Sequence, residues 1–155
     1  MATTLSTVTT LLSRPEWLAV VRIGLGLWWL ESFRHKDKRA WLQRGAGISW
    51  AASVAEKHSL RVVGKVFHAV VEPRKKLFAY VIVFAELAIG AGLAVGLLTP
   101  IAAAGGLLLN IVYFVLMIND WAEQGQNLMM ALASVAVLGS HAWSTWSLGH
   151  AIGLF

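Results

Sequence analysis

The chain contains no cysteine and few charged residues. Asp, Glu, Lys and Arg make up 14% of its 155 residues, against about 25% in an ordinary soluble domain. The absence of cysteine excludes disulfides, thiolate metal sites, iron–sulfur clusters and covalently attached c-type haem. Because so few charged side chains are present to cover a water-exposed surface, we expect much of the surface to contact lipid.

Basic residues are missing from the second half of the chain. All 13 lysines and arginines lie at or before Lys76, and all but two of them fall within residues 34–76. No nucleic-acid-binding motif accompanies this charge, so we expect no nucleic-acid partner. A basic segment between apolar stretches instead indicates contact with anionic lipid headgroups. The candidate headgroup-binding residues are Lys36, Lys38, Arg39, Arg74, Lys75 and Lys76.

Hydrophobic residues are abundant, at 57% of the chain, and the mean hydropathy is +0.66. A membrane-spanning helix needs about 20 largely apolar residues. Four stretches satisfy or approach this requirement, at about residues 15–33, 77–98, 100–118 and 126–143. The short connections at 98–100 and 119–125 make the last three stretches antiparallel neighbours. The sequence therefore predicts an all-α integral membrane four-helix bundle that forms a single domain over residues 1–155.

The basic segment 34–76 separates the first two predicted spans and carries its own apolar pattern. Trp41, Leu42, Ile48 and Trp50 alternate with polar residues, and apolar residues recur at mostly helical spacing between positions 60 and 71. This pattern predicts amphipathic interfacial helices, and the alternative is a solvated basic loop with a small hydrophobic anchor. The positive-inside rule places the segment on the cytoplasmic side and both termini outside. We expect an integral protein of a prokaryotic cytoplasmic membrane.

Two charged residues lie inside the predicted spans. Arg22 is about two helical turns into the first span, and Glu86 is close to the middle of the second. Charged side chains in a bilayer are energetically costly, and they usually face a partner inside the bundle. We therefore predict an ion pair between Arg22 and Glu86, with Asn110 or Tyr113 as a hydrogen-bonding neighbour. The alternative is that Arg22 extends to the headgroups and leaves Glu86 protonated.

Three short motifs are similar to those of a known family. They are 22-RIGLG-26 in the first span, 86-ELAIG-90 in the second, and 96-GLLT-99 at the following turn. Together they resemble the DoxX/DoxD-like family of small four-helix membrane proteins. The resemblance implies a quinone-linked membrane subunit, and some members are part of a thiosulfate:quinone oxidoreductase. The C-terminal segment 139–155 departs from the ending of the thiosulfate-linked relatives.

The resemblance and the composition together favour an accessory role. We expect a small subunit of a larger redox or energy-converting complex that organises lipid or quinone and is not catalytic alone. Trp28, Trp29, Asn110 and Tyr113 are the candidates to line a quinone or lipid groove, because such sites combine apolar walls with a few hydrogen-bonding groups. No catalytic or metal-ligating residue and no covalently bound cofactor is predicted. The alternatives are a DoxD-type quinone-dependent oxidoreductase subunit and a small transporter.

Overall fold

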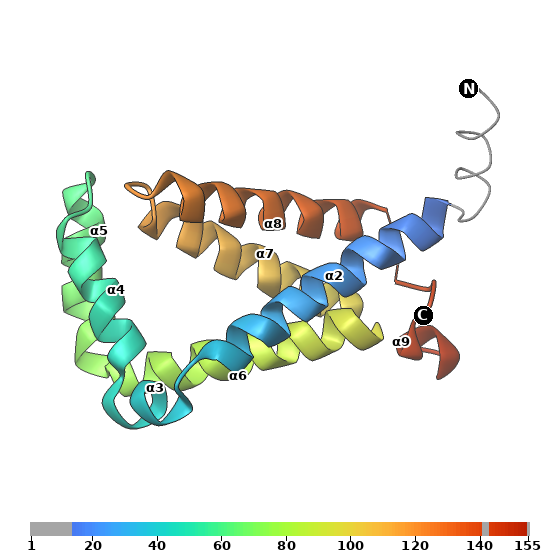
Figure 1. The fold of residues 1–155 in the computed structure, drawn as a ribbon, viewed down its shortest axis with the longest axis horizontal. Coiled ribbons are helices and arrows are strands. Elements are labelled where there is room, and N and C mark those ends of the chain that lie inside the picture. Colours follow the sequence, from blue (N-terminus) through green and yellow to red (C-terminus); the bar gives the residue numbers. More distant parts are fainter. Residues whose placement is uncertain (1–13, 141–142, 155) are drawn as a thin grey trace.

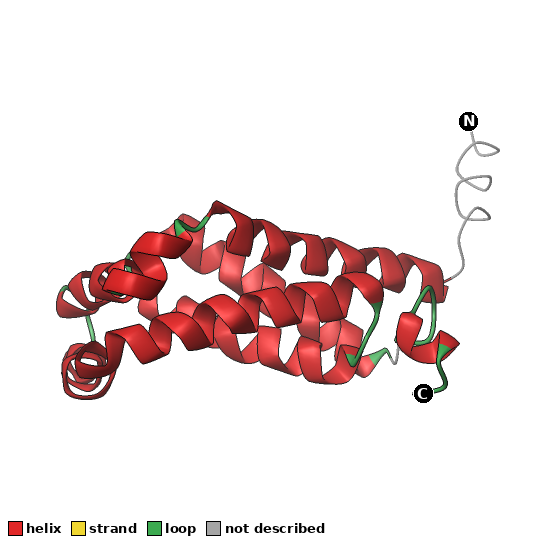
Figure 2. Cartoon of the chain, turned by 90° about the horizontal axis from the view of Figure 1, so that it is seen from below, coloured by secondary structure: helices red, strands yellow, loops and turns green. Residues whose placement is uncertain are grey.

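The computed structural model describes residues 14–140 and 143–154, and these residues form helices and short connections without a β-strand (Figures 1 and 2). Its four long helices are α2 (Arg14–His35), α6 (Lys75–Val95), α7 (Thr99–Leu116) and α8 (Trp121–Gly139). Helix α2 packs against α6 and α8, and α7 packs against the same two helices. The four helices therefore surround one core, and the all-α prediction is confirmed.

The basic segment folds into short helices at one end of the long ones. These are α3 (Lys38–Arg44), α4 (Ala46–Glu56) and α5 (Arg61–Val66), followed by the π-helical turn η1 (Phe67–Val71) and the 3₁₀ turn η2 (Glu72–Arg74). Figure 1 shows α4 and α5 running across the ends of the long helices. We call this end, formed by residues 34–76, the basic end. The short helix α9 (Leu148–Ala151) lies at the opposite end.

The fourth long helix begins earlier than the sequence analysis predicted. Helix α8 starts at Trp121 rather than near residue 126. Asp120 caps it, since its carboxylate accepts hydrogen bonds from the backbone N–H groups of Ala122 at 3.1 Å and Glu123 at 3.2 Å. The connection after α7 is therefore residues 117–120, not 119–125. The predicted end at residue 143 lies beyond the end of α8 at Gly139, and residues 141–142 lie outside the described residues.

Helices α2 and α6 approach each other closely through two glycines. A Cβ atom on Gly26 would lie 2.3 Å from the backbone nitrogen of Ala94, and one on Gly90 would lie 2.8 Å from the backbone nitrogen of Leu30. These distances are too short for a side chain, so only glycine permits the observed contact. The contact fixes the register of the two antiparallel helices, with Gly26 opposite Gly90 and Ala94.

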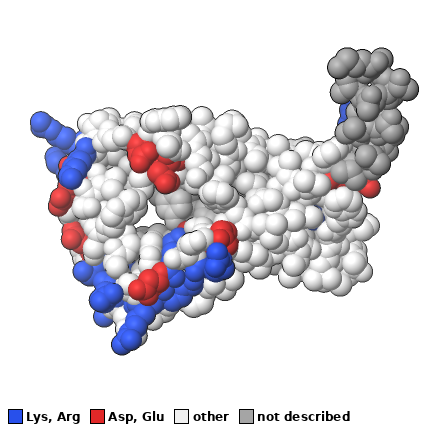
Figure 3. All heavy atoms as spheres, viewed as in Figure 1, with Lys and Arg blue, Asp and Glu red and all other residues white. Residues whose placement is uncertain are grey.

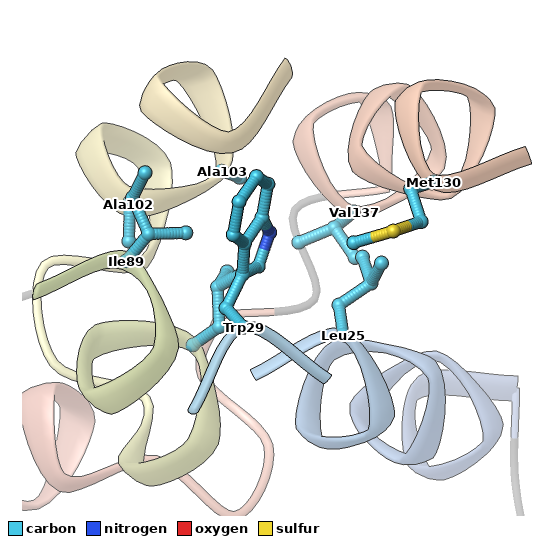
Figure 4. Packing of buried hydrophobic residues seen from close by; sticks show 8 residues of the cluster. Leu25, Trp29, Ile89, Ala102, Ala103, Met130 and Val137 are labelled. Carbon is cyan, nitrogen blue, oxygen red and sulfur yellow. The ribbon is translucent and has the colours of Figure 1, made fainter. Parts of the chain in front are cut away.

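The hydrophobic core lies between the four long helices. Trp29 is at its centre and is only 2% exposed. Figure 4 shows how side chains from all four helices meet around the Trp29 indole. The other labelled residues of this cluster are Leu25 from α2, Ile89 from α6, Ala102 and Ala103 from α7, and Met130 and Val137 from α8.

Buried polar contacts attach the short helices of the basic end to α7. The Nε2 atom of the buried His58 is 2.8 Å from the Val115 carbonyl, and its Nδ1 atom accepts a hydrogen bond from the Leu60 N–H at 2.9 Å. Asn119 donates from Nδ2 to the Lys57 carbonyl at 3.0 Å. These bonds hold the connection between α4 and α5 against the end of α7.

The outer faces of the long helices are strongly apolar. Two helical stretches, Arg61–Val95 and Thr99–Leu116, are long and apolar enough to cross a membrane. Large hydrophobic side chains on all four long helices are exposed. They include Leu27 on α2, Leu77 and Phe84 on α6, Ile101 and Leu108 on α7, and Met129 and Leu132 on α8.

The glycine contact gives a test with a matched control on the same helix. We expect Gly26→Ala to lower the free energy of unfolding by about 1–3 kcal/mol, because the added methyl group meets the α6 backbone. Gly24→Ala should be neutral or slightly stabilising, since no atom of another described helix lies within 4 Å of the added carbon and alanine favours a helix. Thermal unfolding of the full chain in mild detergent checks both. Equal effects of the two substitutions would contradict the helix register.

Candidate functional site

A cavity of about 330 Å³ lies inside the basic end of the bundle. Its walls come from α2, α3, α4, α6, α7, α8 and the turn η1. The surface in Figure 3 is hollowed at this end, between basic side chains on one side and acidic ones on the other. The volume is at the lower end of the range for small-molecule sites, which is about 300–1,000 Å³. A ring-sized headgroup fits inside, and a longer tail would have to extend outwards.

The four residues predicted to line a groove all border this cavity. Trp29 and Asn110 are buried, and Trp28 is half exposed at the edge. The ring centroids of Trp29 and Tyr113 are 6.4 Å apart, which is within the range of a favourable aromatic pair. The structure therefore brings Trp28, Trp29, Asn110 and Tyr113 together from α2 and α7, although they are far apart in the sequence.

A buried ion pair forms the polar part of the cavity wall. Glu86 is fully buried, and its Oε2 atom accepts a hydrogen bond from Lys36 Nζ at 2.6 Å. The Tyr113 hydroxyl donates to the other carboxylate oxygen, Oε1, at 3.1 Å. Lys36 Nζ also donates to Ser32 Oγ at 3.0 Å and lies 4.9 Å from the centre of the Trp41 ring. The carboxylate is thus neutralised, and both of its oxygens have partners.

Arg22 and Glu86 do not form the predicted ion pair. Because Gly26 packs against Gly90 and Ala94, Arg22 lies one turn further along, beside Gly96. The ten residues from position 86 to position 96 correspond to about 15 Å of helix, which exceeds the reach of an arginine side chain. The prediction compared the depths of Arg22 and Glu86 in their spans, counted from estimated span ends. The observed register of α2 and α6 depends instead on the close contact at the glycines.

Arg22 also does not extend to the surface, as the alternative proposed. Its side chain is fully buried, and its Nη2 atom donates to the Trp146 carbonyl at 2.7 Å. Its Nε and Nη1 atoms have no hydrogen-bond partner among the described residues. Arg22 therefore lies at the end of the bundle opposite the cavity and takes no part in it.

The six predicted headgroup-binding residues divide into two groups. Lys36 belongs inside the protein, because its side chain is only 14% exposed and is paired with Glu86. Lys38 folds back over the end of α2 and donates to the carbonyls of Arg34 at 2.9 Å and Lys36 at 3.1 Å. The remaining four are at the surface, where Lys75 is partly buried and the others are exposed. These four are Arg39, Arg74, Lys75 and Lys76.

The sequence analysis missed Lys36 as the partner of Glu86. It assigned residues from position 34 onwards to a surface segment, whereas α2 continues to His35. Extending the helix would have placed Lys36 directly beyond its last turn, on the same face as Ser32 four residues earlier. The sequence offered no signal for this pairing, because depths counted from the span ends placed Arg22 near Glu86.

Two buried polar side chains at the cavity lack partners. Neither Oδ1 nor Nδ2 of Asn110 forms a hydrogen bond within the described part of the chain, and neither does Nε1 of Trp29. Buried polar groups in proteins are nearly always hydrogen-bonded, so Asn110, which borders the cavity, is the candidate to bond a ligand there. Its carboxamide offers N–H donors and one carbonyl acceptor, whereas Trp29 Nε1 lies beside Gly106, which does not line the cavity. No cluster of His, Asp or Glu suited to a metal ion occurs among the described residues.

The ion pair predicts a specific pattern of coupling. Lys36→Met leaves a buried carboxylate without its cation, so we expect it to lower the free energy of unfolding by about 3–5 kcal/mol. Adding Glu86→Gln to Lys36→Met should recover much of that loss. In contrast, the effects of Arg22→Met and Glu86→Gln should add within about 0.5 kcal/mol, because the residues are well separated. Thermal unfolding in detergent measures both double-mutant cycles. Coupling between Arg22 and Glu86 without coupling between Lys36 and Glu86 would contradict the assignment.

Comparison of the chain with models of protein families, with curated proteins and with solved structures found no match. Function must therefore be argued from the residues of the cavity and from the surface of the helices. The strongest evidence of this kind is the neutralised Glu86 together with Asn110, which has no partner among the described residues, in a cavity with aromatic walls.

Proposed function

We propose that the chain is an integral membrane protein in which α2, α6, α7 and α8 all cross the bilayer. The four helices contain between 18 and 22 residues, which gives lengths of about 27–33 Å. The hydrocarbon core of a bilayer is about 30 Å thick. The exposed hydrophobic side chains on their outer faces support this placement, since water would be an unfavourable neighbour for them.

The distribution of charge supports one orientation in the membrane. Lysines and arginines gather at the basic end, and such residues are enriched in cytoplasmic loops. We propose that this end faces the cytoplasm, with α4 and α5 in the interfacial layer. Exposed Trp50, Val62 and Val66 would then contact the acyl boundary, while Arg39, Arg74 and Lys76 reach anionic headgroups.

We propose that the cavity binds a quinone, and that the chain serves as a small accessory subunit of a larger redox or energy-converting complex. One observation carries the proposal. An aromatic cavity is bordered by a buried carboxamide, Asn110, whose two polar atoms have no partner among the described residues. A quinone carbonyl can accept from Asn110 Nδ2 when this side chain turns toward the cavity, and the indole rings can pack against the quinone ring. The resemblance to DoxX/DoxD-like proteins also favours a quinone-linked role.

The charge balance of the site favours a neutral ligand. Lys36 and Glu86 carry opposite charges and contact each other at 2.6 Å, so their sum is zero, and Glu123 in the cavity lining adds one negative charge. An anionic headgroup in the cavity would face the Glu86 carboxylate, whose nearest cation is already engaged. A quinone brings no charge and therefore no such repulsion.

Quinone binding can be measured by quenching of tryptophan fluorescence with a short-chain quinone analogue. We expect Asn110→Leu to weaken binding roughly tenfold, because a buried hydrogen bond to the ligand contributes about 1 kcal/mol or more. Tyr113→Phe should also weaken binding, since the Glu86 carboxylate loses a donor and reorients. Tyr80→Phe is the matched control, because Tyr80 is exposed and stacks on Phe84 away from the cavity.

The quenching results of the three variants distinguish binding in the cavity from nonspecific partitioning of quinone into detergent. Quenching that remains equal in Asn110→Leu, Tyr113→Phe and Tyr80→Phe would show that the cavity is not the binding site. Recovery of the wild-type chain in mild detergent together with other membrane subunits and quinone would support the accessory role. Recovery as a homo-oligomer without quinone would contradict it.

A further inference from the structure

The second buried charge, Arg22, has no counter-ion in the described part of the chain. Each ion pair found there involves other residues, and the only hydrogen-bond acceptor for the guanidinium is the Trp146 carbonyl. Its Nε and Nη1 atoms are buried and have no partner within residues 14–140 and 143–154. A buried cation without an anion is strongly unfavourable. The guanidinium therefore has both the charge and the free donors to bind an anion.

The C-terminal segment 143–154 covers this guanidinium. Two groups of the segment bond to the same carbonyl, that of Gly96, which accepts from Ser147 Oγ at 2.7 Å and from the Gly149 N–H at 3.1 Å. Trp146 itself has a φ of 48°, a left-handed conformation that is unfavourable for a bulky residue. This strain accompanies the Trp146 carbonyl that bonds to Arg22, so the contact that covers the guanidinium is itself strained.

The position of Arg22 along the bundle indicates where its anion would come from. Its Nη1 atom lies beside Gly96, which ends α6 at the turn into α7. In the proposed membrane placement, on which this step rests, the turn is at the headgroup level of the leaflet opposite the basic end. The cover is suited to that level, because its large apolar side chains are about half exposed. These side chains are Trp146, Leu148, Ile152 and Leu154.

We propose that Arg22 is a binding site for a phosphate oxyanion and that segment 143–154 closes it. The bound phosphate replaces the Trp146 carbonyl and accepts hydrogen bonds from Nη2 and from the free Nε and Nη1 atoms. Arginine is well matched to phosphate, because its planar guanidinium donates several charge-assisted hydrogen bonds at once. A phospholipid headgroup and free inorganic phosphate offer the same chemistry, and the experiment distinguishes them.

The test uses the full chain in a maltoside detergent, which contains no phosphate. Short-chain phosphatidylglycerol and inorganic phosphate are titrated separately, and the shift in the thermal unfolding midpoint gives an apparent affinity. We expect a saturable rise with the lipid. Arg22→Met should weaken its affinity roughly tenfold or more, because the charge-assisted bonds are lost. Arg14→Met is the matched control, because Arg14 is an exposed arginine on the same helix, and it should have no effect.

A second variant keeps the test decisive if Arg22→Met fails to fold. Ser147→Ala removes one of the two bonds from the cover to Gly96, so it should tighten phosphate binding severalfold. A response to the lipid alone identifies the headgroup, and an Arg22-dependent response to inorganic phosphate identifies the free anion. The proposal is overturned if neither ligand shifts the midpoint, or if the shift is the same in Arg22→Met. An unchanged affinity in Ser147→Ala also overturns it. Quinone binding, which depends on Asn110, is measured independently of these outcomes.

Discussion

The buried ion pair between Lys36 and Glu86 is the interaction on which the rest of the site depends. A carboxylate in the middle of an apolar bundle requires a cation nearby, and the Lys36 ammonium lies 2.6 Å from it. To supply that cation, α2 must continue to His35 before the chain turns into α3. Tyr113 adds α7 to the same cluster through its bond to Glu86. The pair thus joins α2, α6 and α7 around the cavity and neutralises the Glu86 carboxylate.

The close glycine contact between α2 and α6 determines which charges can meet. With Gly26 against Gly90 and Ala94, Glu86 lies near the basic end of α2, where Lys36 is available. The same register carries Arg22 to the opposite end, beside Gly96. One backbone contact therefore separates the two buried charges, and each has a different environment. Glu86 has an ammonium partner and a cavity, whereas Arg22 has one carbonyl and a covering segment.

Much of the fold follows from composition and spacing, but the pairing of helices does not. Long apolar stretches and the basic segment locate the helices, because hydrophobicity and charge can be read from the local sequence. Four of the residues that border the cavity, Trp28, Trp29, Asn110 and Tyr113, were named from their side-chain chemistry, whereas Trp41, Trp50 and Phe78 were not. The partner of Glu86 was not predicted, since it depends on helix register and on how far α2 extends. The early start of α8 had a readable signal, Asp120 followed by Glu123 in capping-box spacing.

The ionisation state of Glu86 tests the account most directly. The infrared difference spectrum between the wild-type chain and Glu86→Gln isolates the vibrations of this one side chain. An ion pair with Lys36 predicts that the substitution removes carboxylate stretching bands. Loss of the carbonyl band of a protonated carboxylic acid would contradict the account, because a neutral Glu86 would need no cation and would leave the Lys36 charge uncompensated.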